Sequence, residues 1–175
     1  DNHCLPLHYF LPLSFVAVSL LASRDDIIPF SRIVEDYSFF KRLFRHEFIF
    51  DDNRTNLDEV NETMTYLHDR GMIAGEERGS EAWIEVKGRG RTNLKAYAGL
   101  IDNYLESYWV AIRGCAYLRA GELPEREFLR RLNTLGLKMF KKGEITRAES
   151  LSQANYQNAL RYLREQGALM ADERR

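Results

Sequence analysis

The sequence predicts a mostly α-helical fold with one or two short β-hairpins, arranged as winged-helix-like units behind an N-terminal apolar segment. Three observations support this prediction. Apolar residues recur at helical spacing through most of the chain. Two helical patterns end at a glycine and run on into short apolar stretches, as helices followed by strands do. The stretch from Leu5 to Ala22 carries no full charge.

Composition limits what the chain can be. Its 175 residues are 45% hydrophobic and 29% charged, a balance that excludes wholesale disorder. The net charge of −1 gives no overall positive field to attract nucleic acid. Cys4 and Cys115 lie far apart without a CxxC pair, so we expect no disulfide scaffold, metal site or cofactor. Because the chain begins at Asp1, we interpret it as a fragment of a longer protein.

We take residues 1–23 as the first segment, and it has three interpretations. A spanning helix of about 18 residues would cover about 27 Å, short of the roughly 30 Å hydrocarbon core. A signal peptide would need a basic start, which is absent. A buried or membrane-dipping hairpin fits best, with Pro6 and Pro12 in turns or at helix starts. The residues expected to contact a membrane or another domain are Leu11, Phe15, Val16 and Leu20.

Residues 24–87 are expected to form a helical unit with a short hairpin. One helix is predicted to start with Ser31 as N-cap and to carry many aromatic residues. These either pack on two sides of the helix or form a face that lies against the apolar segment or a lipid boundary. A second is predicted from Thr55 or Asn56 to Gly71. The hairpin is expected to pair residues 72–74 with residues 82–86.

Residues 88–175 are expected to hold a long amphipathic helix and a C-terminal helical unit. The stretch GRGR at residues 88–91 is predicted to be a flexible linker and the internal boundary. Helical spacing then continues from Asn93 to Ala116, which predicts one long helix. Two further helices are expected, over residues 125–142 and from Thr146 or Ser150 to Gly167.

A short repeated pattern brings the winged-helix class of proteins into consideration. Residues 66–73 and residues 162–169 share the pattern YLxxxG followed by two apolar residues. Winged-helix readers of DNA show a helix followed by a strand in this way. The helix that ends in the first copy carries Asp58, Glu59, Glu62 and Asp69, and the helix of the second copy carries Gln153, Asn155 and Gln157. Phosphate contact needs lysine and arginine, which dominate neither helix. We therefore expect no nucleic-acid partner, and keep a winged-helix nucleic-acid or protein binding module as the alternative function.

Two patterns contain residue types that can form a catalytic or a lipid-binding site. His46 and Asp51 form a His-x4-Asp, the spacing of an aspartate-oriented general base. No phosphate-binding glycine loop or arginine clamp follows, so we interpret this pair as a structural one. Basic residues spread around the helix predicted over residues 125–142, as a solvated face or a patch for anionic lipid headgroups.

Four segments, in order, resemble the C-terminal region of membrane-associated glycerol-3-phosphate O-acyltransferases, the bacterial type and its mitochondrial and peroxisomal relatives. The segments are NHCLPLHYFLPLSFVAVSLLA, LFRHEFIF, YLESYW and ESLSQANYQNALRYLREQGAL. In that family this region follows the acyltransferase domain, so the resemblance implies that the catalytic motifs belong to the part before it. No catalytic residue is therefore assigned in this chain.

The resemblance implies an accessory role. The parent enzyme would transfer an acyl group from acyl-CoA or acyl-carrier protein to the sn-1 hydroxyl of glycerol 3-phosphate, the first step of phospholipid synthesis. The region would pack on the acyltransferase domain of the same chain and contact membrane lipid. The implied location is the cell membrane, peripheral or shallowly inserted, on the cytoplasmic side.

Overall fold

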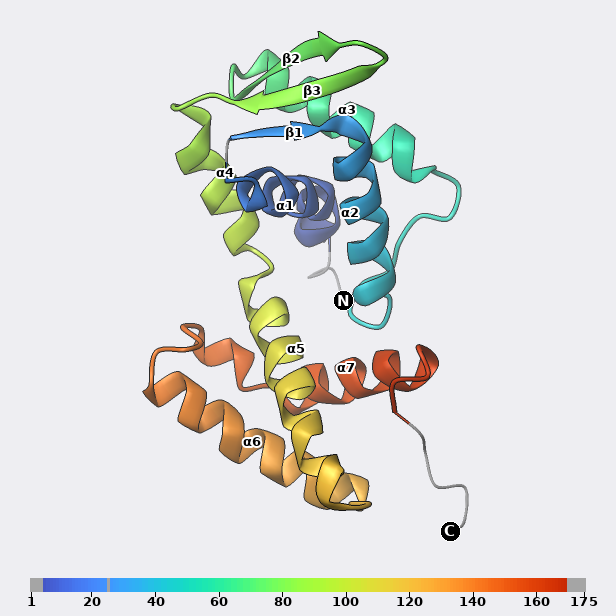
Figure 1. The fold of residues 1–175 in the computed structure, drawn as a ribbon, viewed down its shortest axis with the longest axis vertical. Coiled ribbons are helices and arrows are strands. Elements are labelled where there is room, and N and C mark those ends of the chain that lie inside the picture. The colour runs from blue at the N-terminus through green and yellow to red at the C-terminus, as the bar shows by residue number, and fades with distance from the viewer. Residues whose placement is uncertain (1–4, 25, 170–175) are drawn as a thin grey trace. The chain divides into compact units, whose positions relative to one another are not determined.

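A computed structural model describes residues 5–24 and 26–169, and the side chains of these residues except 5–9 and 120. The chain divides into two compact units, Asp1–Leu100 and Ile101–Arg175 (Figure 1). We call them unit 1 and unit 2. The described part is mostly helical with one small antiparallel sheet, which confirms the predicted fold class.

Unit 1 has the element order of a winged helix. Its elements are α1 (Leu5–Ala22), β1 (Ile27–Pro29), α2 (Phe30–Leu43), α3 (Asn56–Asp69), β2 (Ile73–Arg78), β3 (Glu81–Val86) and α4 (Gly90–Gly99). The three strands form an antiparallel sheet in the order β1-β3-β2 (Figure 1). A helix, a strand, two helices and a hairpin that shares its sheet with the first strand is the arrangement that defines winged-helix units.

The apolar segment forms the central helix of unit 1. It is one continuous helix, α1, with Pro12 inside it, so the prediction of a hairpin that places this proline in a turn or at a helix start is wrong. Pro6 is in the first turn, where its missing amide costs no helical hydrogen bond. Within the described residues, no helix combines the length and apolarity needed to cross a membrane.

The aromatic surplus of α2 packs against α1. Phe15 of α1 lies 5.4 Å from Phe40 and 5.7 Å from Tyr37, measured between ring centroids, with the Tyr37 ring edge-on. Phe44 stacks at 6.0 Å from the same ring. These separations are typical of favourable aromatic pairs. The aromatic face of α2 therefore lies against the apolar segment, one of the two arrangements expected from the sequence.

The hairpin is longer than the sequence indicates. β2 and β3 pair from Ile73↔Val86 to Arg78↔Glu81, around a tight turn at Gly79, which has a φ of +69°. β1, which the sequence analysis missed, adds to the other edge of β3 with Ile28 opposite Ile84. Ser31 does not cap α2: Pro29 is the N-cap residue, and the Ser31 hydroxyl donates to Glu81 instead.

The single long helix predicted from Asn93 to Ala116 is wrong. α4 begins at Gly90, inside the stretch expected to be a linker, and packs on α1. It ends at Gly99, and Ile101 leaves the helical region with φ −113° and ψ 5°. The two units divide at this break rather than at residues 88–91.

The regular secondary structure in the described part of unit 2 is all helical. Its elements are α5 (Asp102–Gly114), η1 (Cys115–Ala120), α6 (Glu125–Lys141), η2 (Ala148–Ser150) and α7 (Gln153–Glu165). Glu106 of α5 ties down the segment before α7, accepting hydrogen bonds from the backbone amides of Thr146 at 2.8 Å and Arg147 at 3.0 Å and from the Ser150 hydroxyl. Unlike unit 1, the described part of unit 2 contains no hairpin.

Candidate functional site

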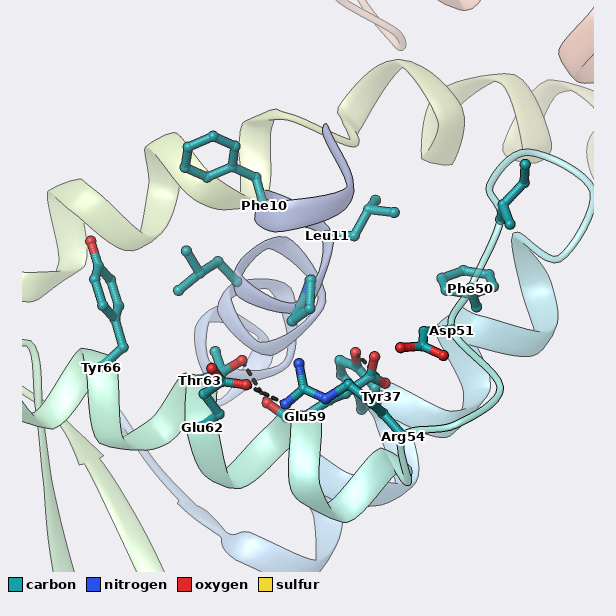
Figure 2. Close-up of a pocket in the computed structure, with 13 residues that line it drawn as sticks. Phe10, Leu11, Tyr37, Phe50, Asp51, Arg54, Glu59, Glu62, Thr63 and Tyr66 are labelled. Carbon is teal, nitrogen blue, oxygen red and sulfur yellow. Dashed lines mark hydrogen bonds and ion pairs between the residues drawn. The ribbon is translucent and has the colours of Figure 1, made fainter. Parts of the chain in front are cut away.

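A pocket of about 1000 Å³ opens in unit 1 between the start of α1, the loop that joins α2 to α3, and α3 itself (Figure 2). We call it the acidic pocket. Its lining residues are Phe10, Leu11, Pro12, Leu13, Tyr37, Ile49, Phe50, Asp51, Arg54, Glu59, Glu62, Thr63 and Tyr66. This volume, and a lining that combines apolar and charged side chains, are typical of a site for a ligand or a peptide.

One lining residue of the acidic pocket, Glu59, belongs to a buried ion pair. Lys41 of α2 and Glu59 of α3 meet with Nζ 2.8 Å from Oε2, and their side chains are only 14% and 10% exposed. The Tyr37 hydroxyl donates to the same Oε2 at 3.0 Å. Burial, together with the nearby Glu59 carboxylate, raises the pKa of Tyr37 well above its ordinary value. The Lys41 ammonium also lies 5.2 Å from the centroid of the Phe50 ring. This network fixes α2 to α3.

The side of the acidic pocket formed by the α2–α3 loop and α3 carries exposed charge. Arg54 of the loop donates to the Glu62 carboxylate of α3. Asp51 accepts from the backbone amide and the side-chain amide of Asn53, both at 2.9 Å. The backbone hydrogen bond, followed by the side-chain one, holds the pKa of Asp51 below its usual value, so this carboxylate is ionised at neutral pH. Figure 2 shows the Arg54 side chain between the carboxylates of Asp51 and Glu62.

Two apolar residues project at the rim of the pocket. Ile49 is 83% exposed and Phe10 is 42% exposed, although both are large hydrophobic side chains. Water contact at such residues is unfavourable, at roughly 25 cal/mol for each Å² of apolar surface. The rim therefore gains from being covered by an apolar group.

The four predicted contact residues lie in the interior of unit 1. Phe15, Val16 and Leu20 are 0% exposed, and Leu11 is 3% exposed. Of the four, only Leu11 lines the acidic pocket. Their contact with a membrane or another domain stays a prediction; in this conformation the elements of unit 1 cover them.

The structure does not bring His46 into the acidic pocket. Asp51 lines that pocket, whereas His46 lies in the turn after α2 and is not among the lining residues. The hydrogen bonds described for Asp51 come from Asn53, which is the geometry of a turn-forming aspartate. In the part of the chain that the structure describes, no three His, Cys, Asp or Glu side chains gather as metal ligands.

The sequence analysis missed the pairing of Lys41 with Glu59 and the exposed pair Phe10 and Ile49. No local pattern marks them, because these residues come from separate elements: three helices, α1, α2 and α3, and the loop that joins α2 to α3.

A second candidate surface lies on α6 in unit 2. One side of this helix exposes basic residues together with two apolar ones, and we call it the α6 basic face. Its residues are Arg126, Arg130, Leu137, Lys138, Phe140 and Lys141. Leu137 is 49% exposed and Phe140 is 37% exposed. Glu127 pairs with Arg130 at 2.8 Å, while Arg126, Lys138 and Lys141 have no ion pair among the described residues.

α3 takes the place of the DNA-reading helix in winged-helix proteins, and its charge has the wrong sign for that role. Asp58, Glu62 and Asp69 are exposed on it, and it contains no lysine or arginine. Phosphate contact is made by basic side chains, so this surface repels a DNA backbone.

Comparison with known families decides the wider assignment. Residues 5–172 match the family described as "Glycerol-3-phosphate acyltransferase C-terminal region". The chain belongs to this family. The match covers nearly the whole chain and confirms the resemblance drawn from the four segments. No curated protein matches the chain. Membership implies an acyltransferase domain in the parent protein as the partner of this region.

Proposed function

We propose that this chain is the accessory region of a glycerol-3-phosphate 1-O-acyltransferase, packing on the acyltransferase domain of the same parent enzyme and helping to seat it on the membrane. The parent would use acyl-CoA or acyl-carrier protein as donor in the first step of phospholipid synthesis. The observation that carries this proposal is the family match over residues 5–172.

The α6 basic face supports peripheral contact with the membrane. Each lysine or arginine near an anionic bilayer adds about 1 kcal/mol of attraction. Leu137 and Phe140 lie among these cations, so they can enter the headgroup region while the basic side chains remain at its surface. Anionic lipids are concentrated in the cytoplasmic leaflet, and we therefore propose the cytoplasmic side.

Vesicle flotation tests the membrane part of the proposal. The chain is expected to float with vesicles of phosphatidylglycerol and phosphatidylethanolamine, and to stay behind with vesicles of phosphatidylcholine alone. Lys138→Glu with Lys141→Glu should reduce flotation strongly, because two attractive charges become repulsive. Arg89→Glu with Lys95→Glu changes the same number of exposed charges in unit 1 and serves as the control. Equal flotation of both double variants would contradict a role for α6.

Activity of the parent enzyme tests the accessory role. The full-length enzyme should transfer acyl groups, and the present chain alone should not. Transfer by this chain in the absence of the acyltransferase domain would overturn the proposal. Deletion of residues 5–172 from the parent enzyme is expected to lower both activity and recovery in the membrane fraction.

A further inference from the structure

We propose that the acidic pocket receives a basic segment of the parent's acyltransferase domain, with a large apolar side chain of that segment held against Ile49 and Phe10. This inference rests on the proposed function, since it names the contact through which unit 1 would hold its partner domain. Three features of the pocket lead to it: its size, the sign of its charge and its exposed apolar rim.

The sign of the charge selects a cationic partner. Three acids (Asp51, Glu59 and Glu62) and one base (Arg54) line the pocket. Asp52 and Asp58 lie in the same stretch of chain outside the lining and bring the formal charge of residues 51–62 to −4. Lys41 compensates only the buried Glu59. Asp51 and Glu62 line the pocket with exposed carboxylates, and only Glu62 is paired with an arginine. A lysine or arginine that reaches Asp51, or that takes the place of Arg54 at Glu62, gains a charge-assisted contact with a carboxylate.

The same carboxylates disfavour the phosphate-bearing molecules expected around this enzyme. Acyl-CoA, glycerol 3-phosphate and anionic phospholipids all carry phosphate groups, which these carboxylates repel. The apolar rim would otherwise suit an acyl chain, so charge is the property that distinguishes a polypeptide from a lipid at this site. A volume of about 1000 Å³ accommodates several side chains of a peptide segment.

Site-specific photo-crosslinking in the full-length parent enzyme tests the proposal. The photo-reactive residue p-benzoylphenylalanine replaces Ile49, whose side chain is 83% exposed, so the replacement leaves the core of unit 1 intact. The control carries the same residue in place of Glu77, which is exposed on β2 of the same unit. A third variant carries it in place of Leu137 on α6. Mass spectrometry then identifies each crosslinked peptide.

The probe at position 49 is expected to crosslink to a segment of the acyltransferase domain that carries lysine or arginine beside a large apolar residue. Adding Glu62→Lys should lower this yield by about tenfold or more, because it places a like charge against the segment. Glu77→Lys, which makes the same charge change on β2, should leave the yield unchanged. Replacing the identified lysine or arginine by glutamate should restore the yield in the Glu62→Lys enzyme.

Failure of this inference differs from failure of the proposed function. If position 49 crosslinks to lipid, to an acidic segment or to nothing, the pocket assignment is wrong. The accessory role is judged separately: it fails if this chain transfers acyl groups alone, or if deletion of residues 5–172 leaves the activity and membrane recovery of the parent enzyme unchanged. An equal crosslinking yield at position 49 with and without Glu62→Lys would also overturn the electrostatic argument.

Discussion

Gly90 lies directly against the backbone of Met72. A Cβ atom at Gly90 would approach the carbonyl oxygen of Met72 to 2.4 Å and its Cα to 2.5 Å. The Lys87 amide donates to that same carbonyl at 2.9 Å, which holds the two segments together. The start of α4 is thus joined to the start of the hairpin through a contact that only glycine allows.

Gly90→Ala is therefore expected to destabilise unit 1 by about 3 kcal/mol, since the Met72 backbone cannot move aside. Gly88→Ala provides a matched control two residues earlier, where a Cβ meets nothing within 4 Å. It should change the free energy of unfolding by less than about 1 kcal/mol. Urea denaturation of both variants checks this. Equal stability of the two would contradict the close approach.

The buried pair of Lys41 and Glu59 predicts strong coupling. Lys41→Met leaves the Glu59 carboxylate buried without its cation and should cost about 3–5 kcal/mol. The double variant Lys41→Met with Glu59→Leu removes both charges and should recover much of that loss. A double-mutant cycle by chemical denaturation measures the coupling energy. Additive effects of the two substitutions would show that the pair contributes nothing.

Tyr156 should limit stability at alkaline pH. Its side chain is fully buried, and among the described residues its hydroxyl has no hydrogen-bond partner. Burial raises the pKa of Tyr156 to about 12. The neutral form favours the folded state, so this contribution is complete below pH 10 and is lost as the pH rises through 12. The free energy of unfolding should fall over that range.

Tyr156→Phe separates this effect from others. At neutral pH the variant should lie within about 1 kcal/mol of the wild type, because no hydrogen bond is lost. Above pH 10 its stability should fall less than that of the wild type. Tyr162→Phe, a change at a half-buried position on α7, is the control. An unchanged alkaline profile in Tyr156→Phe would contradict the assignment.

Glu106 should have the opposite dependence in acid. Desolvation raises its pKa, but hydrogen bonds from Ser150, Thr146 and Arg147 outweigh it, and the net pKa is lowered. The charged form therefore stabilises the fold at neutral pH, and this contribution is lost as the pH falls below the ordinary glutamate value. Glu106→Gln should cost about 2 kcal/mol at pH 7 and reduce the acid dependence. Glu149→Gln, at an exposed position, should do neither.

His46→Ala should leave the transferase activity of the parent enzyme within about twofold, because a true general base contributes about 10²- to 10⁴-fold. His68→Ala on α3 is a matched control at an exposed histidine. Steady-state kinetics with a thermal melt of each variant provides the measurement. A loss of a hundredfold in His46→Ala, with an unchanged melting temperature, would return the His-x4-Asp pattern to the mechanism.

Local signals in the sequence were enough for much of the fold. Glycines mark the ends of α3 and α7, and the hairpin follows from β-forming residues around Gly79. β1 gave no signal because it has three residues and depends on pairing with β3, far along the chain. The break between α4 and α5 was hidden because Leu94, Ala98 and Ile101 continue the apolar spacing across it.

The candidate site was less accessible to sequence reasoning. Lys41 and Glu59 belong to different helices, and the sequence around each residue does not indicate that the two charges pair. Ile49 looks like one more member of an aromatic and aliphatic run, and only the fold reveals that it points to solvent while Phe44 and Phe48 are buried. Such features depend on which elements meet, and local spacing does not contain that information.

The acidic stretch at residues 51–62 and the cations of α6 belong to separately folded units. Under the two proposals made above, a charge reversal in one unit should affect one proposed encounter and leave the other unaltered. Variants that keep lipid binding while losing the protein contact, or the reverse, should be obtainable independently. With such a pair of variants, recruitment of the enzyme to the bilayer and alignment of its domains can be assayed as two distinct steps.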